Sequence, residues 1–412
     1  MKVLVLNGGS SSLKAVLRDL PEGPLPDDAP QPLWEANVDW GRHPGRALIR
    51  VRRGSETARE SDTAIRNPDE VLRPVIETMW SGEAAALRGP EEVRVVGHRV
   101  VHGGKAFRDT TRITPEVRAE IRKYCEFAPE HNRLELEAIE IAEAIFGAAV
   151  PQVAVFDTAF HATLPLAAQV YAGPYEWFEK GIRRYGFHGI SHQYAWQRAA
   201  RILGGDTTRV RLVSCHLGNG ASLAAILGGV SVDTTMGFTP LDGLMMGTRS
   251  GSIDPGILIY LVRHLNYRAD ELDRVLNQES GLKGVSGISA DMREILAAIE
   301  SGDARARLAF DVYAHRLCRE IGGMVAALGG LDVLLFTAGI GENCAPLRAA
   351  VCERMAYLGV KLDAGLNARP RMDSDIAEAG SAVRVLVIHA DEDWQVAREC
   401  HRLLGGGGAL AG

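Results

Sequence analysis

Glycine and serine residues gather near the start of the chain, where their backbone N–H groups and hydroxyls could hold phosphate. Residues 7–12 read NGGSSS and stand between two short apolar runs, residues 3–6 and 13–17. Lys14, in the second run, adds a positive charge. Exposed N–H groups beside a cation form an anion-binding turn. The segment therefore predicts a β-hairpin that contacts phosphate, although a plain hairpin with a polar turn would leave the same pattern.

Two further glycine-rich segments extend this prediction to a nucleotide site. Residues 217–227 (LGNGASLAAIL) match residues 7–17 (NGGSSSLKAVL) at Gly8/Gly218 and at four later positions. Residues 339–343 (GIGEN) follow an apolar run at 333–337, where glycines would let phosphate approach a helix N-terminus. An ordinary strand-to-helix turn is the alternative there. The repeat predicts two similar domains that each contribute a hairpin to one nucleotide site.

Two arginines could grip an anionic substrate. Arg99 lies in the valine-rich run 93–101, which predicts a buried strand, and a buried arginine needs an anionic partner. A bound carboxylate or phosphoryl group would meet that need. Arg249 lies in the glycine-rich segment 246–251, where arginines are usually solvated.

Acids at the ends of predicted strands suggest a Mg²⁺ site. Asp157 follows the apolar run 153–156, and Glu392 follows the run 383–388. Mg²⁺ is usually anchored by one or two carboxylates, directly or through water. A helix N-cap is the alternative for the neighbouring Asp391 and Asp393.

His188 and His192 are four residues apart in YGFHGISH, a spacing that on a helix could bind zinc. Gly186 and Gly189 argue against a helix, and no HExxH motif is present. We therefore favour one histidine acting as a hydrogen-bond donor.

The totals limit the class of protein. A chain of 412 residues predicts two domains, and a net charge of −6 argues against nucleic acid or an anionic membrane as partner. The six cysteines form no CxxC pair, so a disulfide framework is not expected, and no apolar run approaches the length of a membrane span. These features predict a cytoplasmic protein.

Alternating strands and helices predict an α/β fold. Strands are expected at 3–6, 13–17, 93–101, 153–156, 210–216, 222–227, 230–233, 333–337 and 383–388, with short strands within 33–54. Helices are expected at 71–80, from 114 onward, and at 134–146, 257–278, 303–328 and 394–404.

Colinear motifs along nearly the whole chain resemble the acetate kinase family, in the superfamily of acetate and sugar kinases, heat-shock cognate proteins and actin. They are LVLNGGSSSLK (4–14), GHRVVHGG (97–104), APEHN (128–132), VFDTAFH (155–161), RRYGFHGISH (183–192), CHLGNGAS (215–222), TTMGFTPLDGLMMGTRSGSIDP (234–255), ISADMR (288–293) and TAGIGEN (337–343).

The resemblance implies duplicated ribonuclease H-like (actin-like ATPase) domains, each with a central mixed sheet flanked by helices, and an active site in the interdomain cleft. The expected N-terminal domain is 1–157 plus 394–412. The expected C-terminal domain, 158–393, would carry most of the nucleotide site and the interface of a homodimer.

The resemblance also implies an activity: reversible, Mg²⁺- or Mn²⁺-dependent transfer of the ATP γ-phosphoryl group to a short-chain carboxylate, acetate or propionate, giving an acyl phosphate and ADP. The implied catalytic residues are Arg99, His131, Asp157, His188 and Arg249. The implied acyl-group contacts are Arg99, Val101, Phe187 and Pro240, and Asn7 and Glu392 are the implied metal residues. The implied ATP contacts are Asn7, Ser10, Ser12, Lys14, His216, Gly218, Asn219, Gly220, Asp291, Arg293, Gly339, Gly341 and Asn343. Lys14 is expected to support the hairpin more than to touch phosphate.

Four departures from the family pattern bear on the substrate. Glu130 stands where an apolar residue usually completes the methyl pocket, and Arg133-Leu134 replace prolines. Ser252 replaces an acid beside Arg249, and Asp391 replaces an asparagine. They leave two alternatives to an acetate kinase: a kinase of a more polar carboxylic acid, and an ATP-binding module of the actin or chaperone type that phosphorylates no small acid. A dehydrogenase is excluded because no G-x-G-x-x-G follows an early strand.

Overall fold

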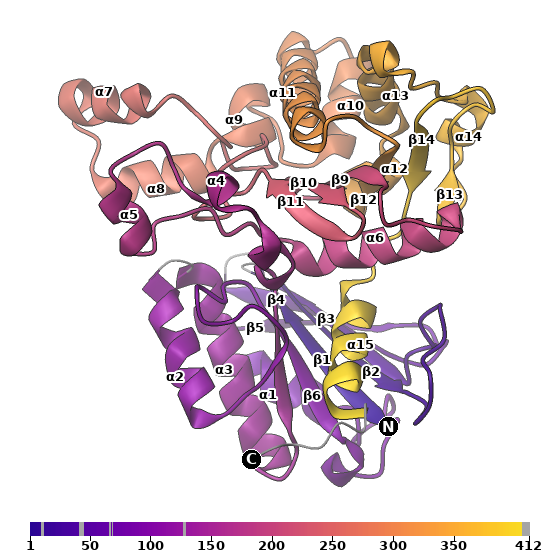
Figure 1. Cartoon of the computed structure of the whole chain (residues 1–412). Coiled ribbons are helices and arrows are strands. Elements are labelled where there is room, and N and C mark those ends of the chain that lie inside the picture. The colour runs from indigo at the N-terminus through magenta and orange to yellow at the C-terminus, as the bar shows by residue number, and fades with distance from the viewer. Residues whose placement is uncertain (10–11, 41–44, 66, 68, 127–128, 406–412) are drawn as a thin grey trace. The chain divides into compact units, whose positions relative to one another are not determined.

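The computed structural model describes residues 1–9, 12–40, 45–65, 67, 69–126 and 129–405, without the side chains of residues 69, 126 and 129–131. The chain divides into two compact units (Figure 1): an N-terminal unit, Met1–Ala159 with Asp391–Gly412, and a C-terminal unit, Phe160–Ala390. The expected boundaries at 157/158 and 393/394, and the roles given to each domain, stay predictions.

The described part of the N-terminal unit contains an eight-stranded mixed sheet with the order β5-β4-β3-β2-β1-β6-β8-β7. The strands β1 and β6 and the strands β6 and β8 are parallel, and the other neighbours are antiparallel. The strands are β1 (Lys2–Gly8), β2 (Ser12–Asp19), β3 (Trp34–Asp39), β4 (Arg46–Arg53), β5 (Arg59–Ala64), β6 (Val95–Val100), β7 (Thr111–Arg112) and β8 (Gln152–Phe156).

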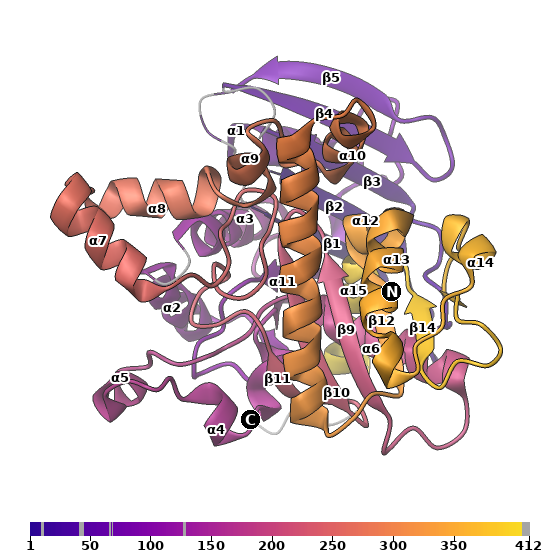
Figure 2. The same ribbon diagram turned by 90° about the horizontal axis from the view of Figure 1, so that it is seen from above.

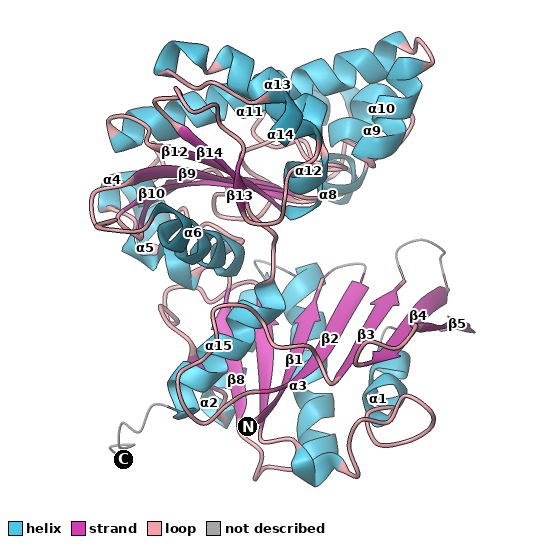
Figure 3. Cartoon of the chain, turned by 90° about the vertical axis from the view of Figure 1, so that its right-hand side faces the viewer, coloured by secondary structure: helices cyan, strands magenta, loops and turns pink. Residues whose placement is uncertain are grey.

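Helices cover both faces of this sheet because successive side chains of its buried strands point to opposite sides. Leu4 and Leu6 of β1 belong to the core shared with α1 (Asp69–Glu77) and α3 (Pro129–Phe146). On the other face, α15 (Glu392–Gly405) packs so closely that a Cβ at Gly97 would lie 2.5 Å from Cys400 Sγ. Figure 3 shows α15 crossing this sheet, so the last helix of the chain completes the first unit. The remaining helix, α2 (Pro115–Lys123), begins at the N-cap Thr114, as predicted.

The C-terminal unit has a six-stranded mixed sheet with the order β11-β10-β9-β12-β14-β13. The strands are β9 (Arg211–Leu217), β10 (Ala221–Leu227), β11 (Val230–Thr234), β12 (Val333–Thr337), β13 (Ser374–Asp375) and β14 (Arg384–Val387). In Figures 1 and 3, α6 (Gly189–Leu203) lies on one face of this sheet and α11 (Ala304–Leu328) on the other. Figure 2 shows α11 running across β9, β10 and β11.

The other helices of this unit are α4 (Leu166–Gln169), α5 (Tyr175–Glu179), α7 (Pro255–Leu265), α8 (Ala269–Gln278), α9 (Gly281–Ser286), α10 (Met292–Glu300), α12 (Ala338–Asn343), α13 (Ala345–Arg354) and α14 (Ala364–Ala368). Short 3₁₀ turns span Pro90–Glu92, Tyr124–Glu126, Ala159–Thr163 and Ala356–Leu358. None of the helices in the described ranges is long and apolar enough to cross a membrane.

The two sheets repeat one topology, which confirms the predicted duplicated mixed-sheet fold. The order β3-β2-β1-β6-β8-β7 corresponds to β11-β10-β9-β12-β14-β13, and each pair of neighbours has the same relative direction in both units. The single sequence offset is wrong in detail. Gly8 pairs with Leu13, five residues later, whereas Leu217 pairs with Ala221, four residues later, so the two hairpins differ by one residue between their last paired positions.

Three local predictions are corrected. Residues 189–203 form a helix despite Gly189, because that glycine occupies the first helical position, where it does not interrupt the later turns. The predicted helix 257–278 is two helices, because Asn266 ends α7 in a left-handed conformation with φ 55°. The glycines of residues 339–343 do not form an open turn but lie inside the short helix α12, and the expected helix follows it as α13, which begins at Ala345.

Candidate active site

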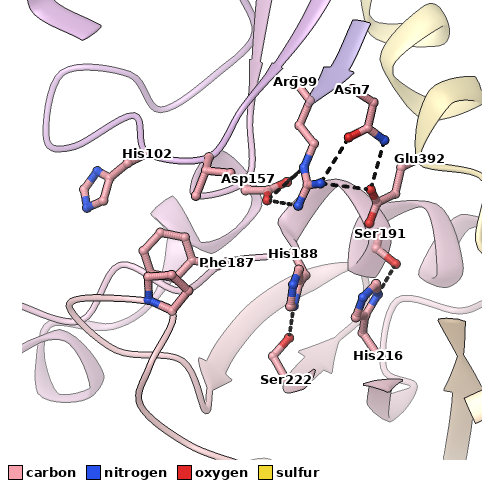
Figure 4. Close-up of polar contacts among 12 residues, drawn as sticks. Asn7, Arg99, His102, Asp157, Phe187, His188, Ser191, His216, Ser222 and Glu392 are labelled. Atoms are coloured by element: carbon pink, nitrogen blue, oxygen red, sulfur yellow. Dashed lines mark hydrogen bonds and ion pairs between the residues drawn. The ribbon is translucent and has the colours of Figure 1, made fainter. Parts of the chain in front are cut away.

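Arg99, in β6, is the centre of a polar cluster formed with Asn7, Asp157 and Glu392 in the N-terminal unit (Figure 4). Its Nη2 lies 2.6 Å from Asp157 Oδ2, and its Nε donates to the same carboxylate. Its Nη1 donates to Asn7 Oδ1 at 3.1 Å and lies 3.5 Å from Glu392 Oε2. The chain itself thus supplies the anionic partner that the sequence assigned to a bound carboxylate or phosphoryl group.

The cluster keeps Arg99 charged and oriented. Burial by itself would lower the pKa of Arg99, but the charges of Asp157 and Glu392 outweigh burial and raise that pKa. Asp157 is buried, whereas the side chain of Arg99 keeps 14 % exposure. A two-point grip on the buried carboxylate leaves the guanidinium in one orientation.

Polar contacts join the first hairpin to the start of α15. Asn7 Nδ2 donates to Asp393 Oδ1 at 3.0 Å and to Glu392 Oε2 at 3.3 Å. Lys14 forms an ion pair with Asp393, and this charge raises the pKa of Lys14 even though burial lowers it. Asp391 caps α15 by accepting from the Trp394 N–H at 3.0 Å. The supporting role expected of Lys14 stays a prediction, and Asp391 is the N-cap of α15, as the alternative had it.

A divalent cation fits this acidic edge in one respect. Glu392 presents a carboxylate with 15 % exposure next to the amide of Asn7. Among the described residues, no group of three or more histidine, cysteine or acidic side chains is arranged to hold a metal ion. Mg²⁺ in kinases is held by one or two carboxylates together with substrate phosphates and water. The single carboxylate of Glu392 beside Asn7 is therefore the kind of site that suits Mg²⁺.

Two residues of α3 that were not among the predicted site residues hold the segment that follows β6. Glu135 accepts from the Val101 N–H at 3.0 and 3.1 Å, and Asn132 exchanges hydrogen bonds with the backbone of His102 at 3.2 Å. Glu135 lies in the helix expected at 134–146, as a polar residue among apolar ones, whereas Asn132 precedes that range, in the motif APEHN (128–132). Together they fix the backbone of Val101, which is an implied acyl-group contact.

Burial raises the pKa of Glu135 to about 8, although the Val101 N–H and the charge of Arg99 lower it. In the unfolded chain the same carboxyl ionises near 4.5. Folded Glu135 therefore stays protonated between these values, and the stability it contributes is lost as the pH rises from about 4.5 to 8.

Glu135→Gln is therefore expected to stabilise the protein increasingly with pH. The gain in unfolding free energy should grow across that window and level off above it, with an upper bound of about 5 kcal/mol at roughly 1.4 kcal/mol per pKa unit. Denaturant unfolding at three pH values checks this, with the exposed Glu140→Gln as control. A gain that does not change with pH would contradict it.

His188 precedes α6 in a left-handed conformation, with φ 56°. Its Nδ1 lies 3.0 Å from Ser222 Oγ, and its ring stacks on His216 with centroids 4.2 Å apart (Figure 4). His192, in the first turn of α6, contacts the same serine through Nε2 at 2.9 Å. Both histidines thus contact one serine hydroxyl, and the donor role expected of one of them stays a prediction.

The side chains of His188 and Arg249 both approach Gly220 in the C-terminal unit. A Cβ at Gly220 would lie 3.3 Å from His188 Nε2 and 3.7 Å from Arg249 Nη1. Arg249 Nη1 also donates to the Pro240 carbonyl oxygen at 3.2 Å. A histidine nitrogen and a guanidinium therefore approach the same glycine turn, an arrangement suited to an anion with several oxygens.

The remaining implied residues of the C-terminal unit form three groups: the ATP contacts His216 and Asn219, the acyl-group contact Phe187, and five further ATP contacts. His216 contacts Ser191 Oγ through Nδ1 at 2.7 Å, and the Asn219 carbonyl oxygen accepts from the Gly247 N–H. Phe187 is buried, and its carbonyl oxygen lies 3.1 Å from His161 Nε2.

The third group contains five further implied ATP contacts, in α10 and its cap and in α12. Asp291 caps α10 and binds Arg293 through both carboxylate oxygens, so each is the other's partner here. Gly339, Gly341 and Asn343 lie in α12, where buried Arg348 donates to the Gly341 carbonyl oxygen at 2.8 Å. The roles of these residues toward ATP stay predictions.

Some residues that the sequence analysis singled out lie outside the described part of the chain, and others have contacts that the sequence did not predict. Ser10 lies outside the described residues, as do the side chains of Glu130 and His131. Gly218 closes the second turn through an N–H bond to the Gly220 carbonyl oxygen at 2.9 Å. Ser252 Oγ donates a hydrogen bond to Asp242 Oδ1, and Asp242 also forms an ion pair with Arg184. Ser12 is an exposed residue at the start of β2.

Comparisons with known proteins agree with this arrangement. The family model described as the acetokinase family matches residues 2–398. The acetate kinase of Gloeobacter violaceus is 58% identical over 401 residues, covering 97% of this chain and 98% of that protein. The acetate kinase of Cyanothece is 54% identical over 404 residues, covering 98% of each.

Solved structures give the same relationship. The Porphyromonas gingivalis acetate kinase has a TM-score of 0.88 at 38% identity, covering 98% of this chain and 99% of that one. A propionate kinase from Francisella tularensis has a TM-score of 0.86 at 35% identity, covering 97% and 98%. Matches that span both units in full, in sequence and in structure, leave one assignment: the chain belongs to the acetokinase family.

Proposed function

We propose that this protein catalyses the reversible transfer of the ATP γ-phosphoryl group to acetate, giving acetyl phosphate and ADP. The observation that carries this proposal is the full-length relationship to acetate kinases at 58% identity. The geometry supports it, because oriented cations and a histidine are what phosphoryl transfer to an anion needs. Neither a kinase of a more polar acid nor a non-catalytic ATP-binding module is favoured by these relatives.

The proposed chemistry depends on charge more than on covalent steps. Acetate is already ionised at neutral pH, so no general base is needed to activate it. It must approach an anionic phosphoryl group, and cations have to offset their repulsion. We assign this task to Arg99 and Arg249, with His188 donating a hydrogen bond to a phosphoryl oxygen. Asp157 orients Arg99.

ATP and ADP are the proposed co-substrates, and Mg²⁺, or Mn²⁺ in its place, the proposed cofactor. Glu392 and Asn7 would hold the ion, directly or through water. When bound, it would neutralise charge on the phosphates. A cytoplasmic location stays a prediction.

A hydroxylamine trap for acyl phosphates tests the activity directly. With ATP and Mg²⁺, we expect hydroxamate from acetate, less from propionate and least from polar acids such as glycolate or malonate. Absence of hydroxamate with every acid would overturn the proposal. Faster turnover of a polar acid would instead restore the interpretation of Glu130 as a substrate contact.

We also propose that two copies of the chain associate through α7. Five large apolar side chains of this helix are exposed: Ile257, Ile259, Tyr260, Val262 and Leu265. No residue of α7 is buried. A helix that is apolar around its circumference is stable in water only when it is covered, and a self-complementary surface favours a symmetric dimer.

Ile259→Arg is therefore expected to convert a dimer to a monomer, because it places a charge in the covered face. Sedimentation equilibrium of the wild-type protein and the variant measures the mass. Leu366→Arg, at an exposed leucine of α14, is the matched control and should stay dimeric. A monomeric wild-type protein, or a dimeric Ile259→Arg variant, would contradict the proposal.

A further inference from the structure

A buried chain of hydrogen bonds extends from His188 into the sheet of the C-terminal unit. Ser222 Oγ, on β10, lies 3.0 Å from His188 Nδ1 and 2.9 Å from His192 Nε2. Ser214 Oγ, on β9, lies 2.9 Å from His192 Nδ1. His192, Ser214 and Ser222 each have no exposed surface. We call the sequence Ser214–His192–Ser222–His188 the histidine–serine chain.

The protons along this chain cannot be placed independently. A serine hydroxyl carries one hydrogen, and a neutral imidazole carries one N–H and one acceptor nitrogen. Ser222 Oγ lies between two ring nitrogens, and the described residues offer its buried hydroxyl hydrogen no other acceptor. It therefore donates to one ring nitrogen and accepts from the other. If Ser222 donates to His188 Nδ1, then His192 Nε2 donates to Ser222 and Ser214 donates to His192 Nδ1. The reverse order puts the His188 proton on Nδ1.

The condition that couples these bonds is a neutral His192. Burial lowers the pKa of His192 well below its usual range, and His161 and His216 lower it further. A ring that remains neutral has one N–H to offer, so the direction of one bond fixes the next. His188 Nε2 and Cε1, on the ring edge away from Ser222, are the atoms that approach Gly220 near Arg249, and Nε2 is the one of the two that can carry a hydrogen-bonding proton.

We propose that Ser214, His192 and Ser222 are positioning residues that set the His188 tautomer with the proton on Nε2. That proton is then directed to the phosphoryl oxygen, while a lone pair at the same atom would repel it. The inference rests on the proposed function only for which atoms donate along the histidine–serine chain, because the hydrogen bonds themselves are independent of any substrate. A buried partner that fixes a catalytic imidazole tautomer can change the rate greatly without touching the substrate.

The test removes single hydroxyls from the chain. Ser222→Ala is expected to lower kcat about 10- to 100-fold, by analogy with the loss found when the outer hydrogen-bond partner of a metal-ligating histidine is removed. Ser214→Ala, one link farther away, is expected to lower kcat about 3- to 10-fold. The KM values for ATP and acetate should change less than about twofold, since neither serine is assigned to substrate binding.

The matched control is Ser231→Ala. Ser231 Oγ lies 2.8 Å from Nδ1 of His161, which is also buried, so the control loses a hydrogen bond of the same kind outside the histidine–serine chain. Its unfolding free energy should fall as much as that of Ser214→Ala, while kcat stays near the wild-type value. If Ser231→Ala lost as much kcat as Ser214→Ala, the effect would be merely structural and the inference would be overturned.

The direct readout is the tautomer itself. Correlation spectra of protein labelled with ¹⁵N-histidine, bound to ADP, Mg²⁺, aluminium fluoride and acetate, distinguish protonated from bare ring nitrogens. We expect protonated Nε2 in His188 of the wild-type protein and a mixture of tautomers in Ser222→Ala. A proton on His188 Nδ1 in the wild-type complex would overturn the inference.

The His188→Gln variant separates the two proposals. Loss of turnover in His188→Gln together with unchanged kcat in both serine variants would overturn only the positioning role. Full turnover in His188→Gln would overturn the assignment of His188 in the proposed function, whatever the serine variants do.

Discussion

Arg249→Ala is expected to lower kcat at least about 10²- to 10³-fold, the usual cost of removing one preorganised donor from a charged transition state. The physical reason is that acetate and the phosphoryl group are both anionic, and this guanidinium offsets part of their repulsion. Arg249 lies in a loop, and its Nη1 donates to the Pro240 carbonyl oxygen at 3.2 Å. Its loss should therefore leave the two sheets intact.

Steady-state hydroxamate formation measures this effect, with far-ultraviolet circular dichroism to check the fold. Arg249→Lys keeps the charge but loses the planar fork, and it should recover only part of the rate. Arg268→Ala, an exposed arginine of the same unit, is the matched control with unchanged turnover. Turnover by Arg249→Ala within a few-fold of wild type would remove this residue from the mechanism.

The second large effect is expected at the pair of Arg99 and Asp157, where stability and catalysis should separate. Arg99→Ala leaves the buried Asp157 carboxylate without its main partner, which costs about 3–5 kcal/mol when one member of a buried pair is removed. Asp157→Asn should be destabilising for the same reason. Both variants should also lose turnover, because each removes or misdirects the Arg99 guanidinium.

The double variant Arg99→Met with Asp157→Leu tests the origin of each effect. Replacing both members of a buried ion pair with apolar groups is often neutral for stability. We expect the double variant to recover most of the unfolding free energy and none of the turnover. A double variant that regains activity would show that the pair is structural only.

Periodic patterns of buried side chains made much of the fold predictable. The hairpin of β1 and β2 and that of β9 and β10 were both found, because apolar runs end at glycine turns. The strand β5 was not found, since every residue in Arg59–Ala64 is exposed and it has no apolar period. The helix α6 was missed because Gly189 was read as a break, although a glycine at a helix start costs little.

The candidate site divides in the same way. Arg99, Asp157, His188 and Arg249 could be named because they lie in motifs that combine glycine, charge and a strand end. Glu135 was not named, and Asp393 was named only as a possible helix cap, because their contacts depend on partners far away in sequence. Glu135 meets Val101 at a separation of 34 residues, and Asp393 meets Asn7 at 386.

The sequence by itself determined the family, the α/β class and the residue types that suit phosphoryl transfer to a carboxylate. These follow from local order, which is present before the chain folds. The tertiary structure alone decided which groups satisfy one another: Asp157 with Arg99, Asp393 with Lys14, and Ser222 with two histidines. The physical reason is that a buried charge or hydroxyl takes its protonation and direction from the partners it meets in space, and those partners come from distant strands and helices.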